Sequence, residues 1–294
     1  MGIKMDSECL LCQMRRNIEK ARSLGDEEKA MAFAREMIKN FLEVPEDTSS
    51  PVLSPKTSEL FRKYYGLSPN RFQKEKDESN RFVLERLDEI QEKVEQAEDP
   101  FLAGLQFAIL GNYIDFSALD GKVSFQQLDK MLEDALSMQI DERNLSCLRQ
   151  DLSRGRKLLY LTDNAGEICF DRVFAQQIAK KYPQLQITFC VRGGPAQNDA
   201  TREDAQLAGI PFPVIDNGNT VPGTVIELLS EEAKYAMEQA DVIIAKGQGN
   251  IETLFGCGYN VYYAFLVKCV RFQKIFEKPQ FTPMLVRDRD KREQ

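Results

Sequence analysis

The residues best suited to chemistry lie where a short apolar run, 158–161, gives way to the polar sequence Thr-Asp-Asn-Ala-Gly-Glu at 162–167. The run predicts a strand, and the polar segment predicts a tight turn before a helix. In open α/β sheets, ligands bind at the carboxyl ends of strands. Asp163, Asn164 and Glu167 offer oxygen ligands but no basic group. We therefore expect this turn to bind a divalent cation rather than a naked phosphate.

Further polar segments follow three later apolar runs. Because the carboxyl ends of parallel strands meet at one edge of a sheet, we expect these segments to lie together. They offer a third acid, cations and glycine-rich backbone, which suits a phosphate ester bridged to a divalent cation. The segments are Arg192-Gly193-Gly194 with Asn198-Asp199 after the run 187–191, Asp216-Asn217-Gly218 after 213–215, and Lys246-Gly247-Gln248-Gly249-Asn250 after 242–245.

Each segment also has a purely structural interpretation. An Asp-Asn-x-Gly turn often only caps its own backbone and the next helix. The Lys-Gly-Gln-Gly-Asn segment resembles a phosphate cradle but lacks the Walker spacing. Gly111 and Asn112 could simply end a helix, whereas a functional interpretation places Asn112 and Asp115 at the mouth of the site, contacting substrate hydroxyls. The joint occurrence of the four polar segments at successive strand ends favours a binding site.

The chain has no histidine, which narrows the possible chemistry. Histidine is the commonest metal ligand and the usual general base near neutral pH. Its absence excludes Ser-His-Asp and Cys-His catalysis, His-ligated zinc and phosphohistidine chemistry. Acid–base work falls to Asp, Glu, Lys, Cys, Tyr or metal-bound water, and oxygen ligation favours magnesium or manganese.

Composition predicts a globular protein with a substantial core. The 294 residues are 43% hydrophobic and 29% charged, with no apolar run long enough to cross a bilayer. The N-terminus shows neither a secretory signal nor a myristoylation pattern. A net charge of −7 argues against broad nucleic-acid binding. We expect a cytoplasmic protein that binds neither membrane nor nucleic acid; its oligomeric state is not predicted.

The two halves of the chain differ in hydrophobic periodicity. Helical spacing dominates the first half, with predicted helices over 77–98, from Pro100 onward and over 125–138, and a connection at 44–58. Beyond residue 150, four apolar runs and two later ones at 261–267 and 284–286 alternate with helical stretches, which indicates βαβ units. The sequence predicts an α/β protein with a helical N-terminal subdomain (1–150) and a Rossmann-like, mostly parallel sheet in the C-terminal half (151–294).

The seven cysteines are odd in number and mostly far apart, which fits reduced thiols better than a disulfide framework. Cys9 and Cys12 form a Cys-x-x-Cys pair. A redox pair, half of a zinc site and two packed thiols are all open interpretations. No second close pair completes a four-thiolate site, and no βα unit precedes the pair as in thioredoxin-like motifs.

Five motifs in order resemble a known family. They are Cys9-x-x-Cys12 followed by Arg15, Gly-Asn-Tyr-Ile-Asp at 111–115, Asp-Asn-Ala-Gly-Glu at 163–167, Val-Arg-Gly-Gly-Pro at 191–195 with Asn-Asp-Ala-Thr at 198–201, and Lys-Gly-Gln-Gly-Asn-x-Glu at 246–252. This set, spanning residues 9–252, resembles the damage-control phosphatase family, formerly a domain of unknown function. It most resembles the stand-alone microbial branch with the N-terminal cysteine pair.

The resemblance implies a metal-dependent phosphatase that hydrolyses phosphorylated small metabolites, such as sugar phosphates or damaged phospho-metabolites. The implied cofactor is a divalent metal: manganese, cobalt, nickel or magnesium. The resemblance also implies that Asp163 and Asn164 bind the metal, that Asp199 is the third ligand, and that 246–250 is the glycine-rich loop of the site.

Both arguments predict metal-assisted attack of water on a phosphate ester, in which the cation neutralises phosphate oxygens and orients or deprotonates the water. The expected catalytic residues are Asp163, Asn164, Glu167 and Lys246. We expect Lys246 to stabilise charge on the equatorial oxygens, and Glu167 to start the helix or orient water. A phospho-Asp163 intermediate is an alternative. The expected substrate-binding residues are Asn112, Asp115, Arg192, Gly247, Gln248, Gly249 and Asn250.

Two other functions fit the same pattern. A Rossmann-like half with acids at its strand ends could bind S-adenosylmethionine in a methyltransferase, although the first βα turn lacks a Gly-x-Gly-x-x-Gly fingerprint. A non-catalytic module could sense a phosphorylated metabolite and signal through its helical half.

Overall fold

The described residues of the computed structural model, 2–114 and 124–288, contain a six-stranded sheet in the order β3-β2-β1-β4-β5-β6. The first five strands run parallel, and β6 pairs antiparallel with β5. This confirms the predicted α/β fold with a mostly parallel sheet. The strands are β1 (Lys157–Leu161), β2 (Gln186–Val191), β3 (Val214–Asp216), β4 (Val242–Lys246), β5 (Val261–Leu266) and β6 (Pro283–Arg287).

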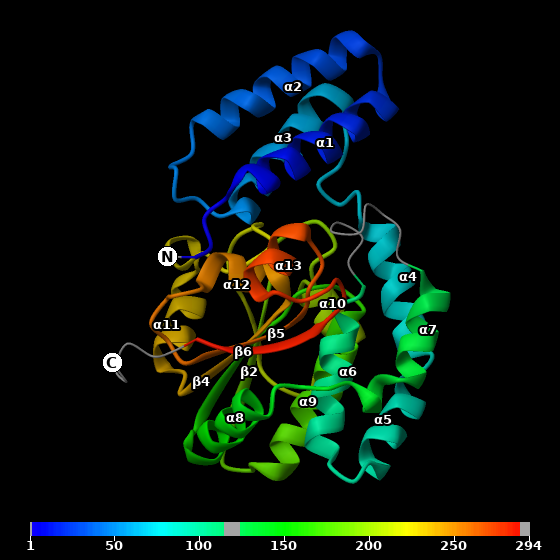
Figure 1. Cartoon of the computed structure of the whole chain (residues 1–294), viewed down its shortest axis with the longest axis vertical. Helices are drawn as coiled ribbons and strands as arrows, with labels where there is room; N and C mark the ends of the chain where they lie inside the picture. The colour runs from blue at the N-terminus through cyan, green and yellow to red at the C-terminus, as the bar shows by residue number, and fades with distance from the viewer. Residues whose placement is uncertain (1, 115–123, 289–294) are drawn as a thin grey trace.

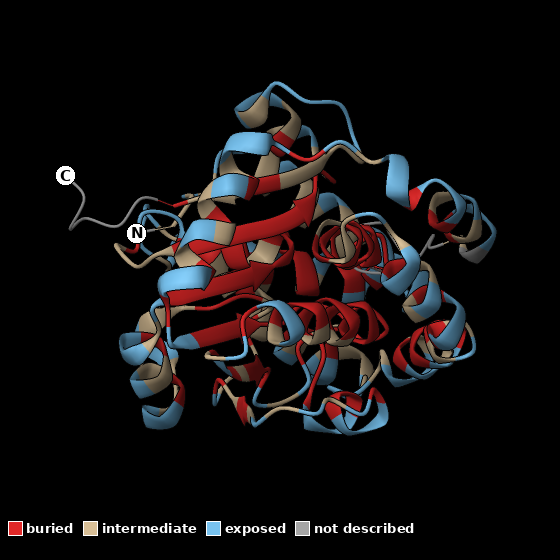
Figure 2. Cartoon of the chain, turned by 90° about the horizontal axis from the view of Figure 1, so that it is seen from below, coloured by how far each residue is buried: buried red, intermediate tan, exposed pale blue. Residues whose placement is uncertain are grey.

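Successive strand residues face two different hydrophobic cores. In β1, Leu158 and Tyr160 belong to one core, and Leu159 and Leu161 to the other. Because both faces of the sheet are covered, the strands are continuous apolar runs rather than alternating patterns. Figure 2 shows the buried strands between helices that expose only their outer sides.

Helices cover the two faces unequally, as Figure 1 shows. The larger core packs α4 (Gln73–Leu84), α5 (Leu87–Gln96), α6 (Pro100–Gly111), α7 (Phe125–Glu133), α8 (Glu142–Arg154), α9 (Glu167–Lys181) and α10 (Arg202–Leu207). The other core packs α11 (Glu231–Gln239), α12 (Gly247–Leu254) and α13 (Val270–Phe276). No helix in the described residues is long and apolar enough to span a bilayer.

The first three helices form a separate cluster at one end of the molecule, drawn in blue in Figure 1. They are α1 (Ser7–Leu24), α2 (Glu27–Leu42) and α3 (Ser54–Tyr65). Their core centres on Phe33 and Phe61, whose ring centroids are 4.7 Å apart. The packing thus separates α1–α3 from α4–α8, which share a core with the sheet. The division of the chain at residue 150 stays a prediction about domains.

Three predicted helical boundaries differ from the structure. The helix predicted over 77–98 breaks at Arg86, whose guanidinium bonds the Phe82 carbonyl at 3.0 Å and Asp129 at 2.9 Å. The connection predicted at 44–58 is shorter, because a 3₁₀ turn at Ser50–Leu53 leads into α3. The segment 125–138 divides into α7 and a 3₁₀ turn at Ala135–Ser137.

The sheet order creates a crevice between β1 and β4. From β1 the chain proceeds outward to β2 and β3, and it then returns to β4 on the other side of β1. At such a switch point the connections leave in opposite directions, which opens a ligand-binding crevice at the carboxyl ends of the two strands. The loops that follow β1 and β4 contain the predicted site residues.

Candidate active site

The loop after β1 is joined to the loop after β2. The Ala200 N–H donates to the Asp163 carbonyl at 2.7 Å, and Asn164 and Asp199 form an isolated antiparallel bridge. The pairing brings Asp163, Asn164 and Asp199 to the lining of one cavity. The structure therefore places the three predicted metal-binding residues together.

This cavity has a volume of 610 Å³ and lies between α1 and the carboxyl edge of the sheet. Its floor contains the two acids together with Asn164, and Gln248 and Gly249 from the first turn of α12. Its walls come from α1 and from the segment that connects β5 to α13. We call it the main cavity.

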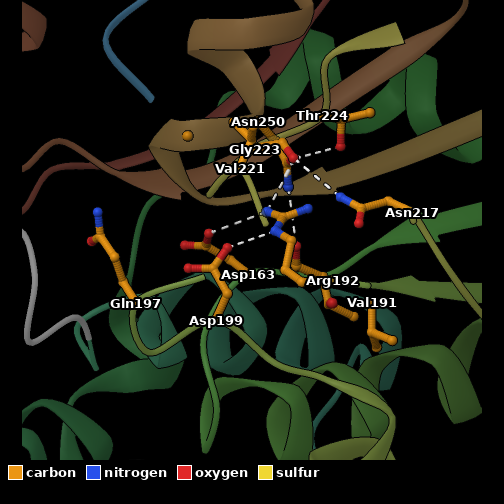
Figure 3. A network of polar contacts seen from close by, with 12 residues as sticks. Asp163, Val191, Arg192, Gln197, Asp199, Asn217, Val221, Gly223, Thr224 and Asn250 are labelled. Atoms are coloured by element: carbon orange, nitrogen blue, oxygen red, sulfur yellow. Dashed lines mark hydrogen bonds and ion pairs between the residues drawn. The ribbon is translucent and has the colours of Figure 1, made fainter. Parts of the chain in front are cut away.

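Asp163 and Asp199 lie side by side and face Arg192, as Figure 3 shows. The Arg192 Nε donates to Asp199 Oδ2 at 2.6 Å, and its Nη2 lies 3.8 Å from Asp163 Oδ1. Arg192 is 2% exposed, and it donates to Asn250 Oδ1 at 3.4 Å on its other side. The guanidinium thus orients both acids from beneath and lines a neighbouring 470 Å³ cavity rather than the main one.

The Asp163 carboxylate is also held by two amides. Its Oδ2 accepts from Asn112 Nδ2 at 2.9 Å and from Asn164 Nδ2 at 2.8 Å. Asn112 is fully buried, and its own Oδ1 accepts from the Leu266 N–H at 3.1 Å. This corrects the expectation that Asn112 contacts substrate at the mouth of the site. Its predicted neighbour Asp115 lies outside the described residues.

Gly247 leaves the space that Asp163 fills. Its φ is +77°, and a Cβ at this position would lie 1.9 Å from Asp163 Oδ2. Only glycine combines this backbone conformation with so close an approach. The glycine predicted to contact substrate therefore shapes the floor around the acid.

We expect Gly247→Ala to displace Asp163, lowering any activity of the site about tenfold or more and stability by about 1–3 kcal/mol, since backbone strain and a clash combine. Gly256→Ala is the matched control, because Gly256 has a φ of +76° and a Cβ added to it would meet no atom within 4 Å. It should lose stability through strain alone and keep activity. Equal activity losses in both variants, measured by steady-state kinetics and urea unfolding, would contradict this role of Gly247.

Lys246 lies beneath the floor rather than in the main cavity. Its fully buried Nζ is 2.7 Å from Glu167 Oε1 and 3.0 Å from Asp171 Oδ1, and it donates to the Ala108 carbonyl at 2.6 Å. Although burial lowers it, the carboxylates of Asp171 and Glu167 raise the pKa of Lys246 above its ordinary value. This geometry corrects the expectation that Lys246 contacts phosphate oxygens.

Glu167 is fully buried and connects Lys246 to the floor. Its carboxylate accepts from Asn164 Nδ2 at 2.8 Å, from the Asn164 N–H at 3.3 Å and from Asn112 Nδ2 at 3.0 Å. Glu167 was expected either to start the helix or to orient water. The structure supports the first role, at the start of α9, because protein groups enclose the side chain. Glu167 therefore positions the amides that hold Asp163.

Asn250 also serves the floor from below. It is fully buried, and its Nδ2 donates to the Lys246 carbonyl at 2.6 Å and to the Thr162 carbonyl at 3.1 Å. Its Oδ1 accepts from Thr224 Oγ1 at 2.8 Å (Figure 3). Asn250 thus ties the loops after β1 and β4 together, which corrects its predicted contact with substrate. Gln248 and Gly249 do line the main cavity, and their contact with substrate stays a prediction.

Lys268 is the strand-end cation that the sequence interpretation missed. It follows β5, lines the main cavity and is 4% exposed. Its backbone N–H donates to Gln248 Oε1 at 2.6 Å, which connects it to the first turn of α12. The sequence does indicate a cation at this strand end, since a lysine directly follows the apolar run 261–267. The five motifs end at residue 252, so none of them includes this lysine.

Burial raises the pKa of the Asp171 carboxyl to about 7, although the Lys246 ammonium opposes this. A carboxyl with a higher pKa in the folded state keeps a proton there that the unfolded chain releases. Between the ordinary value of 3.8 and about 7, the contribution of Asp171 to the unfolding free energy should therefore fall as pH rises. We expect the unfolding free energy of Asp171→Asn, measured by urea unfolding at several pH values, to fall less or rise more with pH across this range than that of wild type. Parallel curves for the two proteins would contradict the raised pKa.

The floor suits a hard divalent cation. Two carboxylates and an amide oxygen are ligands that magnesium and manganese accept, and magnesium is commonly held by one or two carboxylates plus water and substrate phosphate. The two carboxylates face one guanidinium, that of Arg192. The floor therefore has a net negative charge that a cation can neutralise. Within 2–114 and 124–288, no group of three or more His, Cys, Asp or Glu side chains is arranged to hold a metal. The fit therefore depends on Asp163, Asp199 and the Asn164 amide.

The Cys-x-x-Cys pair lies on α1 at the wall of the main cavity. Cys9, Cys12 and Cys269 all line it, and all seven cysteines are free thiols. Arg271 Nη1 donates to Cys9 Sγ at 3.0 Å. Burial raises the pKa of the Cys9 and Cys269 thiols, which disfavours reactive thiolates. The redox, zinc and packing interpretations of the pair stay predictions.

Other proteins are similar to this chain over most of its length. An uncharacterised protein of Methanocaldococcus jannaschii is 33% identical to this chain and covers 91% of it, with 90% of that protein covered. A damage-control phosphatase of Archaeoglobus fulgidus is 30% identical, with 86% of this chain and 88% of that protein covered. A damage-control phosphatase of Pyrococcus horikoshii is 29% identical, with 98% of this chain and 100% of that protein covered.

The fold matches as well. The crystal structure of a DUF89 family protein from Pyrococcus horikoshii aligns with a TM-score of 0.82 at 27% identity, covering 98% of this chain and 100% of that one. The family model described as the damage-control phosphatase ARMT1-like domain matches residues 5–281, a span that includes α1, the first five strands and every described site residue. The family predicted from the five motifs is confirmed: the chain belongs to the damage-control phosphatase ARMT1-like family.

Proposed function

We propose that the protein is a metal-dependent phosphatase that hydrolyses phosphate monoesters of small metabolites. The observation that supports this most is the pair of buried acids, Asp163 and Asp199, held side by side at the floor of a cavity at the switch point of the sheet. The names of two relatives, both damage-control phosphatases, agree with this activity.

Asp163, Asp199 and the Asn164 amide are the groups that would hold the metal, with manganese, magnesium, cobalt and nickel as candidates. A bound divalent ion neutralises phosphate oxygens and makes a nearby water a better nucleophile. Arg192 holds the two acids side by side from beneath. We favour attack by water over a phospho-Asp163 intermediate, because this carboxylate is committed to the metal.

Lys268 and the first turn of α12 take the role predicted for Lys246. Lys268 places a buried cation at the cavity wall. Gln248 and Gly249 contribute backbone N–H groups, which lack intrahelical partners in the first turn of a helix and suit an anion. We propose that these groups bind the oxygens of the transferred phosphoryl group and stabilise their charge in the transition state.

The test is turnover of p-nitrophenyl phosphate by protein treated with a chelator and dialysed. We expect no hydrolysis before metal is added, and hydrolysis restored by manganese or magnesium. Zero turnover with every metal and every phosphate ester tested, together with retained binding of a phosphorylated metabolite, would favour a sensor instead. The methyltransferase alternative is disfavoured, because the turn after β1 lacks a Gly-x-Gly-x-x-Gly fingerprint and carries Asp163 of the floor.

We further propose that the enzyme depends on a metal, is specific for phosphate monoesters and acts on sugar phosphates or damaged phospho-metabolites. A cytoplasmic location and the absence of nucleic-acid partners are expectations from composition and charge.

A further inference from the structure

The walls of the main cavity carry an excess of positive charge. Among the described residues that line it above the floor, the cations are Arg15, Arg16, Lys268 and Arg271, and the acids are Glu8 and Glu252. Glu8 is neutralised by Lys274 at 2.6 Å. This positive wall stands in a chain whose net charge is −7, so it is a local feature of the cavity.

Two of these cations differ in how they are held. Arg271 is anchored between α13 and α1, since its Nε lies 3.2 Å from Asp6 Oδ2 and its Nη1 donates to Cys9 Sγ at 3.0 Å. The side chain of Arg15, on the exposed surface of α1, has no hydrogen bond or ion pair with any other described residue. A guanidinium that lines a cavity without an acidic partner is suited to binding an anion there.

The size of the cavity leaves room for a large leaving group. Cavities of about 300–1000 Å³ enclose most of a small organic ligand, and this one measures 610 Å³. The transferred phosphoryl group occupies the floor beside Asp163 and Asp199 under the proposed function. The rest of the substrate must then extend toward α1, where arginine side chains meet it.

We propose that the leaving group of the substrate carries a second anionic group, a phosphate or a carboxylate, which Arg15 binds at the α1 wall. Arginine binds both groups through paired charge-assisted hydrogen bonds. The proposal rests on the proposed phosphatase activity and adds the class of its substrate. It also assigns a function to α1, which packs outside the core of the sheet yet forms one wall of the site.

Three probe substrates test this: a hexose 6-phosphate, the corresponding aldonic acid 6-phosphate and a hexose 1,6-bisphosphate. We expect kcat/KM for one of the two-anion substrates to exceed that of the hexose 6-phosphate. This preference should fall about tenfold in Arg15→Ala, a change of about 1.4 kcal/mol, and further in Arg15→Glu. The substrate with the larger preference identifies carboxylate or phosphate as the second anion. Arg22→Ala, on the same helix but outside the cavity and paired with Glu27, should keep the preference.

Equal kcat/KM on all three substrates in the wild type would overturn the inference while leaving the phosphatase intact. A preference that survives both Arg15 variants would also overturn it, since Arg15 would then not bind the second anion. Failure of all three substrates and of p-nitrophenyl phosphate, with every metal added, would instead refute the proposed function.

Discussion

Asp163→Asn should lower kcat for metal-restored hydrolysis of p-nitrophenyl phosphate by about 100-fold or more. The substitution keeps the shape of the side chain, but it leaves Asp199 as the only carboxylate at the floor and lets Arg192 offset it completely. The charge that attracts a divalent cation is then lost. Steady-state kinetics with a manganese titration would measure both the fall in kcat and the weaker metal dependence, and Asp199→Asn should behave alike.

Asp216→Asn is the matched control for these variants. Asp216 ends β3 and so is also a strand-end acid, but it pairs with Arg202 at 2.7 Å and does not line the main cavity. Its loss should leave activity within about threefold, as expected for a partly exposed ion pair. Wild-type metal dependence in both Asp163→Asn and Asp199→Asn would show that the metal binds elsewhere.

The sheet could be predicted because its strands are buried on both faces. All six apolar runs became strands, and helices α9 to α13 alternate with them. The break between α4 and α5 could not be predicted, because it depends on the contact of Arg86 with Asp129 on a different helix. An apolar stripe at helical spacing carries no information about such a distant partner.

The site was predictable at the level of loops and less so at the level of side chains. Asp163, Asn164 and Asp199 face the main cavity, as expected from their position at strand ends. Lys246 is the last residue of β4, so its side chain still follows the pleat of the strand and points toward α9. Lys268 lies two residues beyond β5 and reaches the cavity. A sequence does not show at which residue a strand ends, and that residue decides the direction of the side chain.

The buried polar residues below the floor form a connected support. Lys246 bonds Glu167, Glu167 accepts from Asn112 and Asn164, and both amides donate to Asp163. A network of this kind fixes its members when every group has a partner, and it is costly when one partner is removed. Asn112 and Lys246, first expected to contact substrate, are therefore better understood as groups that hold Asp163 in place.

Lys246→Met should be the most destabilising single substitution in this network, lowering the free energy of unfolding by about 3–5 kcal/mol. Methionine fills similar volume, but it leaves Glu167 and Asp171 facing each other in a fully buried site without their shared cation. Denaturant unfolding of wild type and variant at pH 8 would measure the loss. Adding Asp171→Asn to Lys246→Met should recover part of it, because a neutral amide replaces a buried carboxyl that has lost its cation.

Lys180→Met is the control for Lys246→Met. It shows how much unfolding free energy is lost when an ion pair is removed at the surface rather than in the core. Lys180 lies 2.6 Å from Glu95, as close as Lys246 lies to Glu167, but both partners are solvent-exposed. Water already solvates these charges well, so the unfolding free energy should change little. If both variants lost the same small amount of unfolding free energy, packing by methionine alone would replace the buried cation. The interpretation that Lys246 supports the Asp163 site would then be wrong, even if the variant remained folded.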